Sequence, residues 1–479
     1  GGTHGVARYP AVTMAVHSSH PVSAPPAAPP RERTSHILLR GWCIALLIVT
    51  LSGTALPLAF GVPVAAAIGV VSFLVSVILW ATIRPRVQWP RLPWYALAYI
   101  VWALASILWT HWLEATLTTV ALLIVTTVGA LFVGAVLTWR DVVRALASAL
   151  KWMLGLSILF ELWVSLIWDG PILPHFERPA GPVADPIVLW SRDNLLDGGR
   201  IQGIFGNSNA LAYVALLAIV VFAIRIASRA PRRPVLALWL VLAVYLFVRA
   251  GSATATLSAV AVGVVLITVL VMRTTTRAGE RTRYYLAYGI LAVGGLLAAW
   301  LLRDHVFTAL GRSSDLTGRE SIWEKVLARA VEHPVIGWGF STPWIPTDPA
   351  FDRWIVDHGQ TVMQAHNMWV DVFLQLGAVG IVLIAAAYVA FVWRSWFFAI
   401  DRPRWDLVSD RPYTAVTLLP TLTGAILLVQ GLAESTPLLN WGWFLLILFA
   451  FKIKQAPLVG RGPSEERLIG EQGDRPLER

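Results

Sequence analysis

Residues 364–393 read QAHNMWVDVFLQLGAVGIVLIAAAYVAFVW, and this stretch decides the class of fold. From Met368 onward it is predominantly apolar and longer than the roughly 20 residues that an α-helix needs to cross a bilayer. Its beginning is nevertheless polar, because His366 and Asn367 precede the apolar run and Asp371 follows within its first turn. The meaning of these polar residues depends on where the helix lies in the membrane topology.

Lipid is the predicted solvent for most of this chain. Of its 479 residues, 57% are hydrophobic and 14% are charged, and the mean hydropathy is +0.65. A water-soluble core of ordinary composition does not bury that much apolar surface. The single cysteine, Cys43, excludes an internal disulfide and a metal site built from cysteines. The net charge of +10 comes from short arginine clusters between apolar segments, which indicates membrane topology rather than nucleic-acid binding.

Twelve apolar segments have the approximate length of membrane spans, so the predicted fold class is an all-α polytopic membrane protein with about 12 transmembrane helices. The segments lie near residues 38–56, 63–83, 93–112, 115–137, 143–168, 204–224, 235–250, 253–272, 284–302, 368–393, 413–432 and 437–453. An even number of spans places both termini on the same side of the membrane.

The distribution of arginine predicts the orientation. Short connections on the side of the termini hold 17 arginines, whereas short connections on the other side hold only Arg249. Cytoplasmic loops are enriched in Lys and Arg, so both termini are predicted to be cytoplasmic. Two long loops, near residues 169–203 and 303–366, then face outward, and any chemistry is expected on that face.

The chain divides into a membrane domain with a tail at each end. Residues 1–36 are rich in Pro, Ala, Ser and His and predict a disordered N-terminal tail that includes a tag remnant. Residues 37–453 form the predicted transmembrane helical domain, within which residues 303–366 form an extracytoplasmic cap loop carrying short helices. Residues 454–479 predict a disordered cytoplasmic tail.

The cap contains one recognisable helix, within LTGRESIWEKVLARAVEHP at residues 316–334. Thr317 and Glu320 have the spacing of a capping box. Pro334 ends the helix, because the residue before a proline is disfavoured in the α region. Arg319 is therefore predicted at the helix N-terminus, where free backbone N–H groups and the helix dipole already favour an anion.

A second polar stretch, GGRIQGIFGNSNALAYV at residues 198–214, precedes another span. Arg200 stands before that span, and its glycines permit close approach of the backbone. Asn207 and Asn209 bring amide side chains to the outer edge of the membrane. Interfacial anchoring by a snorkelling arginine and turn residues is an equal alternative to a binding site.

Arg249 breaks the distribution of positive charge, so it needs an anionic partner. Glu434, in GLAEST, is predicted on the same face of the membrane. A structural ion pair between Arg249 and Glu434 and a role of Arg249 in ligand binding are both open.

His366 is predicted at the outer end of its span. Asn367, Asp371 and Gln375 recur every four residues and line one stripe of the helix. That stripe must face protein or a water-filled cavity, because charge is costly in hydrocarbon. A capping histidine with a polar seam between helices is the alternative to a functional site.

The outer arginines and His366 form a coherent set if the ligand is a lipid-linked diphosphate. Arginine forms bidentate hydrogen bonds with phosphate oxygens and stays protonated, so it can hold the leaving group without a metal. A neutral histidine can take a proton from an incoming hydroxyl. No metal ion or other cofactor is expected.

Four stretches between residues 200 and 390 also carry a family resemblance: RIQGIFGNSNALA, SATATLSA, LTGRESIWEKVLARAVEHPVIGWGF and AHNMWVDVFLQLGAVG. They resemble the O-antigen ligase and Wzy-type polymerase (Wzy_C) superfamily of bacterial polytopic membrane glycosyltransferases, which implies a GT-C-like fold. One departure is that SATATLSA stands where many members carry Ser-Arg. The upstream Arg249 either substitutes for that arginine or does not.

The resemblance implies metal-independent, inverting transfer of a glycan from a polyprenyl-diphosphate carrier to an acceptor hydroxyl at the outer face of the cytoplasmic (inner) membrane. The acceptor is a glycan, lipid or protein, and no nucleic acid is involved. His366 matches the essential histidine of the family, while Arg200 and Arg319 match arginines that bind the diphosphate. The candidate substrate-binding residues are Arg249, Asn207, Asn209, Asn367 and Glu434.

Other functions remain open at this point. A Wzy-type polymerase with a lipid-linked acceptor shares the same donor chemistry. A transporter of lipid-linked glycans is the non-enzymatic alternative, although transporters usually place their polar sites near the bilayer midplane. Membrane glycosyltransferases with a catalytic acid in the first outer loop are disfavoured, because PLAFGVP has no acidic residue.

Overall fold

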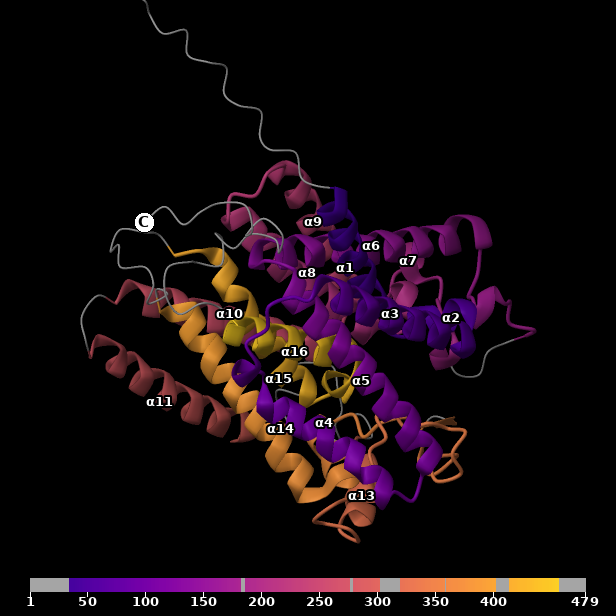
Figure 1. Cartoon of the computed structure of the whole chain (residues 1–479). Helices are drawn as coiled ribbons and strands as arrows, with labels where there is room; N and C mark the ends of the chain where they lie inside the picture. The colour runs from indigo at the N-terminus through magenta and orange to yellow at the C-terminus, as the bar shows by residue number, and fades with distance from the viewer. Residues whose placement is uncertain are drawn as a thin grey trace, which may run out of the picture.

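The computed structural model describes residues 34–181, 186–275, 279–301, 319–357, 359–401 and 413–455, which form an all-α membrane protein (Figure 1). The predicted tails lie almost wholly outside these residues. The helices are α1 (Thr34–Ser52), α2 (Ala55–Phe60), α3 (Val62–Ile83), α4 (Trp94–Ala105), α5 (Leu113–Val136), α6 (Trp139–Trp163), α7 (Asn194–Asp197), α8 (Ser208–Ala227), α9 (Arg233–Ala250), α10 (Ala253–Thr274), α11 (Glu280–Leu301), α13 (Arg319–Ala330), α14 (Met368–Ile400), α15 (Leu419–Gly431) and α16 (Asn440–Gln455). An antiparallel hairpin pairs β1 (Val356–Asp357) with β2 (Gln360–Thr361).

Within the described part of the chain, eight helices are long and apolar enough to cross a membrane: α1, α3, α5, α6, α8, α9, α10 and α14. The all-α polytopic class is therefore confirmed. Twelve spans were predicted, and the other four predicted segments coincide with α4, α11, α15 and α16. Of these, α4, α15 and α16 have fewer than 18 residues.

The outside of the bundle is as apolar as its centre. Helix α8 is largely buried and packs against α6, α9, α10 and α15. Helix α3 lies at the periphery, where Val70, Leu74 and Ile78 are exposed. An apolar exterior of this extent marks a surface that contacts a membrane, and helices suit that solvent because they satisfy their own backbone hydrogen bonds.

The described part of the cap, residues 319–357 and 359–366, has its own hydrophobic cluster beside the first turns of α14. Ile322 and Val326 of α13 are buried in this cluster, together with Trp344 and Phe351. Helix α13 begins at Arg319 and ends before Pro334, whereas Thr317 of the predicted capping box lies outside the described residues.

The cap is fixed to α14 where that helix is interrupted at Gly377 (φ 63°). The backbone N–H of Trp338 donates to the carbonyl of Leu374 (3.0 Å). The next amide, of Gly339, donates to the carbonyl of Gln375 (2.9 Å). A side chain at Gly377 would place its Cβ 2.3 Å from the backbone of the cap loop, so only glycine permits this approach. The cap and the beginning of α14 therefore form one structural unit.

Candidate active site

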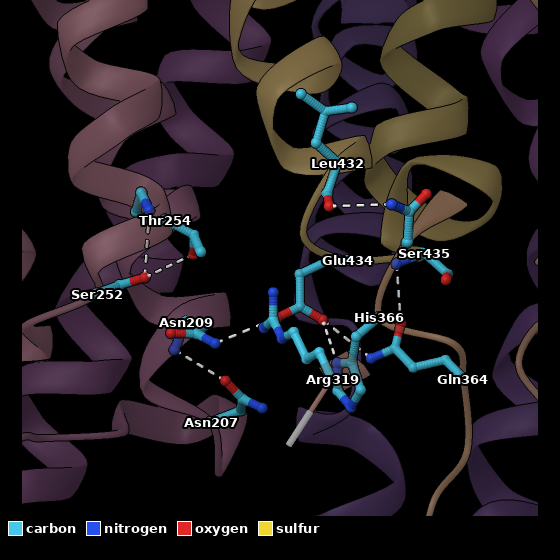
Figure 2. Close-up of polar contacts among 12 residues, drawn as sticks. Asn207, Asn209, Ser252, Thr254, Arg319, Gln364, His366, Leu432, Glu434 and Ser435 are labelled. Atoms are coloured by element: carbon cyan, nitrogen blue, oxygen red, sulfur yellow. Dashed lines mark hydrogen bonds and ion pairs between the residues drawn. The ribbon is translucent and has the colours of Figure 1, made fainter. Parts of the chain in front are cut away.

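Segments far apart in the sequence meet at one end of the helical bundle. Asn209 lies in the first turn of α8, Arg319 begins α13, and His366 comes directly before the cap residue of α14. Glu434 follows α15. Figure 2 shows Asn209, Arg319 and His366 arranged around the carboxylate of Glu434. The convergence expected from the sequence is thus present for Arg319, His366, Asn209 and Glu434.

The carboxylate of Glu434 is the centre of this network. Its Oε1 accepts hydrogen bonds from Asn209 Nδ2 (3.2 Å) and Arg319 Nη2 (3.4 Å). Its Oε2 accepts from Gln364 Nε2 (3.0 Å) and lies 3.1 Å from His366 Nδ1. A buried carboxylate is tolerated when it is paired and hydrogen-bonded in this way.

The surroundings of Glu434 keep it ionised. Burial alone would raise the pKa of this carboxyl group, but the contacts with His366, Arg319 and Asn209 outweigh burial and hold the pKa below its ordinary value. Glu434 is therefore a carboxylate at neutral pH, and a carboxylate only accepts hydrogen bonds.

This acceptor determines which nitrogen of His366 carries the proton. Because Glu434 cannot donate, Nδ1 of His366 must be the protonated nitrogen of the neutral ring. The other nitrogen, Nε2, then has a free lone pair. The side chain of His366 is 31% exposed, whereas that of Glu434 is 9% exposed, so the histidine is the accessible member of the pair.

The backbone around His366 is held from both sides. His366 has a left-handed conformation (φ 51°), which is uncommon for a residue other than glycine. On one side, the indole N–H of Trp323 donates to the carbonyl of Ala365 (2.8 Å). On the other side, Asn367 caps α14, since its Oδ1 accepts from the amides of Trp369 (2.9 Å) and Val370 (3.3 Å).

The polar stripe of α14 faces protein. Asp371 and Gln375 are fully buried. Asp371 accepts from the backbone amide of Ala365 (3.0 Å) and from the hydroxyl of Ser435. Gln375 accepts from the backbone amide of Ser341 (2.9 Å). These two residues join α14 to the cap and to the segment after α15, as the polar-seam interpretation predicted, whereas the cap of the helix is Asn367 and not the histidine.

Arg200 is connected to Glu434 through one residue, Asn209. Its Nη2 donates to Oδ1 of Asn209 (3.1 Å), and its Nε donates to the carbonyl of Ala250 (2.9 Å). Asn209 in turn contacts Glu434. The adjacent Asn207 caps α8, because its Oδ1 accepts from the amides of Asn209 (2.8 Å) and Ala210 (3.2 Å).

Arg249 does not form the ion pair with Glu434 that was one of its two predicted roles. Its Nη2 donates instead to the carbonyls of Asn194 (2.7 Å) and Leu195 (2.9 Å). The side-chain partners of Glu434 are instead Asn209, Arg319, Gln364 and His366. Arg249 thus holds the loop before α8, and its role as a ligand for substrate stays a prediction.

Two residues of this region, Gln364 and Glu161, were not among the predicted site residues. Gln364 was part of the quoted stretch, but its contact with Glu434 depends on the fold. Glu161, near the end of α6, accepts from the backbone amides of Gln202 (3.0 Å) and Gly203 (2.6 Å) and from the hydroxyl of Ser191 (2.9 Å). An acidic residue inside an apolar segment is the signal that would have identified Glu161.

The network borders a cavity of about 160 Å³. Asn209, Gln364 and Glu434 line it on the polar side. Phe205 and Trp441 are among the apolar residues that line the rest. The cavity is smaller than the usual ligand pocket of about 300–1,000 Å³, and His366, Arg319 and Arg200 are not among its lining residues.

Comparison with known proteins agrees with the family expected from the motifs. The family model described as O-Antigen ligase matches residues 238–385. The matched region covers less than half of the chain, and it confirms the predicted resemblance to the O-antigen ligase family. Arg319 and His366 lie inside the region matched to the O-antigen ligase model, whereas Arg200 and Glu434 lie outside it.

Two curated relatives are similar to parts of this chain. The Exopolysaccharide production protein ExoQ of Rhizobium meliloti (strain 1021) is 26% identical over 221 residues, which is 44% of this chain and 48% of that protein. The O-antigen ligase of Pseudomonas aeruginosa is 28% identical over 186 residues, which is 37% of this chain and 40% of that protein. The matches thus span less than half the length of either relative.

Proposed function

We propose that this protein is a glycosyltransferase that moves a glycan from a polyprenyl-diphosphate carrier to an acceptor hydroxyl. The observation that carries the proposal is the contact of 3.1 Å between His366 Nδ1 and the ionised Glu434, with Arg319 on the same carboxylate. The match of residues 238–385 to the O-antigen ligase family model supports the class of reaction.

In the proposed reaction, Nε2 of His366 takes the proton of the acceptor hydroxyl. The hydroxyl oxygen forms a bond with the anomeric carbon, and the bond between that carbon and the diphosphate oxygen breaks. The electron pair leaves with the diphosphate, where Arg319 and Arg200 offset the developing charge. Glu434 keeps Nδ1 protonated and stabilises the imidazolium that forms, by the same logic as the acid in a Ser-His-Asp triad.

This single displacement inverts the anomeric centre, as in inverting glycosidases. Because arginine and histidine supply both the charge and the base, the proposed step is independent of a metal ion. Arg249 and the amide side chains of Asn207, Asn209 and Asn367 are the further proposed contacts with substrate. Because Oδ1 of Asn207 and Oδ1 of Asn367 cap their helices, the Nδ2 groups are the candidate donors to substrate, and Nδ2 of Asn367 also donates to the carbonyl of Leu432 (3.3 Å).

The proposed topology has about twelve spans in the cytoplasmic (inner) membrane, with both termini cytoplasmic and the site extracytoplasmic. Its support is the arginine count of the short connections. A Wzy-type polymerase, with a lipid-linked acceptor, is the second candidate, and the ExoQ relative favours it because its name refers to polysaccharide production. Incubation with different acceptors distinguishes ligase from polymerase.

The direct test uses the purified chain, a labelled polyprenyl-diphosphate-linked glycan and an acceptor. We expect the substitution His366→Ala to lower the transfer rate by about 10²- to 10⁴-fold, the usual contribution of a general base. The matched control is His175→Ala, because His175 is an exposed histidine of the other long loop. Transfer that survives in His366→Ala contradicts the proposed base. A wild-type protein that moves the donor across vesicles without consuming it supports the transporter instead.

A further inference from the structure

The end of the bundle opposite to Glu434 carries a second concentration of charge. Helix α8 connects the two ends, with Asn209 in its first turn and Arg225 in its last turn. The helical rise separates these two residues along the axis by roughly 24 Å. The second region is therefore distinct from the proposed active site, and it contributes to none of the contacts described there.

Two adjoining cavities lie at this end, with volumes of about 630 and 540 Å³. Arg144 and Arg225 line both, so the two cavities form one basic site. The cationic residues that line the basic site are Arg40, Arg140, Arg144, Lys151, Arg225, Arg229 and Arg232. Among the described residues that line it, none is acidic.

Among the described residues, the positive charges of the basic site are balanced by few carboxylates. Asp141 lies 3.7 Å from Arg40 and 3.4 Å from Arg144, so one carboxylate serves two guanidinium groups. Arg225 is close enough to Arg140 and Arg144 for their charges to repel one another. Cations held together in a recess concentrate anions there. Arginine favours phosphate in particular, because its planar fork matches phosphate oxygens.

The apolar surface beside the basic site indicates whether a bound phosphate would belong to a lipid or to a soluble molecule. On α6, Ser148 lines the site, and Trp152, Leu156 and Leu159 follow it on the same face at intervals of three or four residues. All three are exposed. An apolar stripe thus runs from the basic site toward the middle of the membrane-spanning helix.

A matching stripe runs along α9. Val235 lines the basic site, and Leu238, Val241 and Tyr245 continue its face with exposed side chains. Helices α6 and α9 pack against each other. The two stripes therefore flank one surface that leads away from the charges into the hydrocarbon. A soluble phosphate would contact only the cationic side chains, whereas a phospholipid would contact both these side chains and the apolar stripes of α6 and α9.

We propose that the basic site binds the phosphate headgroup of an anionic phospholipid, with its acyl chains along the exposed faces of α6 and α9. Basic pockets between helices on the cytoplasmic side of membrane proteins bind such headgroups. Two joined cavities suit a headgroup with two phosphates, as in cardiolipin.

The test is a titration of cardiolipin into the detergent-solubilised full chain, followed by native mass spectrometry. Phosphatidylcholine and inorganic pyrophosphate are titrated in parallel. We expect cardiolipin to bind in preference to both. The double variant Arg144→Gln/Arg225→Gln removes the two cations that line both cavities, and we expect it to bind cardiolipin roughly 30-fold more weakly.

The matched control is Arg84→Gln/Arg86→Gln, which removes two exposed arginines from the same end of the bundle without touching the basic site. A second variant of the basic site, Arg140→Gln/Arg232→Gln, changes exposed residues. It keeps the test valid if the first variant fails to fold. Weaker binding in both cavity variants but not in the control supports the proposal. Equal lipid binding in all variants overturns it, and pyrophosphate that binds as tightly as cardiolipin overturns the choice of a lipid.

Discussion

Glu161 and Glu434 are two buried glutamates near the same end of the bundle, and they differ in what they contact. Glu161 is 1% exposed and accepts from two backbone amides and a serine hydroxyl. Glu434 is 7% exposed and contacts a histidine, an arginine and two side-chain amides. The first holds a loop in place. The second holds groups that can exchange protons and bind anions.

The comparison shows that burial alone does not identify a functional carboxylate. Both glutamates are compensated by donors, as a buried charge must be. Two partners of Glu161 are backbone amides and the third is the hydroxyl of Ser191, so these contacts fix the turn that follows Arg200 and Ile201. The partners of Glu434 reach solvent to different degrees, and one of them is a titratable ring. The chemistry of the partners separates the two roles.

The largest expected difference between the two glutamates lies in catalysis. We expect Glu434→Gln to lower the transfer rate by about 10²- to 10⁴-fold, because an amide neither stabilises an imidazolium nor keeps Nδ1 protonated. The loss of thermal stability should be small, since Asn209 and Gln364 can reorient their amides and His366 is partly exposed. Rates measured with labelled donor, beside melting curves in detergent, check both parts. Unchanged turnover in this variant contradicts the role given to Glu434.

Glu161→Ala should show the opposite pattern. It removes the oxygen that accepts from the backbone amides of Gln202 and Gly203, and a buried N–H group left without an acceptor costs about 1–3 kcal/mol. A clear fall in the thermal midpoint is expected, and any loss of transfer should follow from displacement of Arg200. A melting curve indistinguishable from wild type, together with a large loss of rate, would place Glu161 in the chemistry instead.

The pH dependence of stability gives a smaller effect. Glu434 has a pKa below its ordinary value in the folded protein, so its carboxylate contributes stability in full above the ordinary glutamate pKa of about 4.3. That contribution declines as the pH falls through the lowered pKa. The thermal midpoint of wild type minus that of Glu434→Gln should therefore shrink as the pH falls through that lowered pKa. A difference that still grows below the ordinary glutamate pKa has the wrong sign for this interpretation.

Much of the fold could be predicted from hydropathy, because a bilayer imposes length and apolarity on each helix. Each predicted segment coincides with a helix, and eight helices of the described part of the chain are long and apolar enough to cross a membrane. The interruption at Gly377 was not predicted, since a glycine in an apolar helix has no sequence signal for the backbone that enters it.

Most residues of the candidate site were named from the sequence, but the contacts among them were not predicted. The resemblance pointed to His366, Arg200 and Arg319, whereas Glu434 was predicted as a substrate contact or as the partner of Arg249 in an ion pair. The sequence alone does not determine which of several cationic side chains on one face contacts a given carboxylate in the fold. Asn207 and Asn367, in contrast, stand directly before apolar helices, and this position is the ordinary signal for an N-cap.

Chemical rescue tests the role of His366 most directly. Glycine suits the left-handed backbone at this position (φ 51°), so His366→Gly should fold and leave room for an imidazole beside Glu434. We expect His366→Gly to lose about 10²- to 10⁴-fold in transfer rate, with part of it restored by added imidazole in a saturable manner and none by sodium chloride at equal ionic strength. Transfer near the wild-type rate without imidazole, or no response to imidazole while the donor still binds, would contradict His366 as the base.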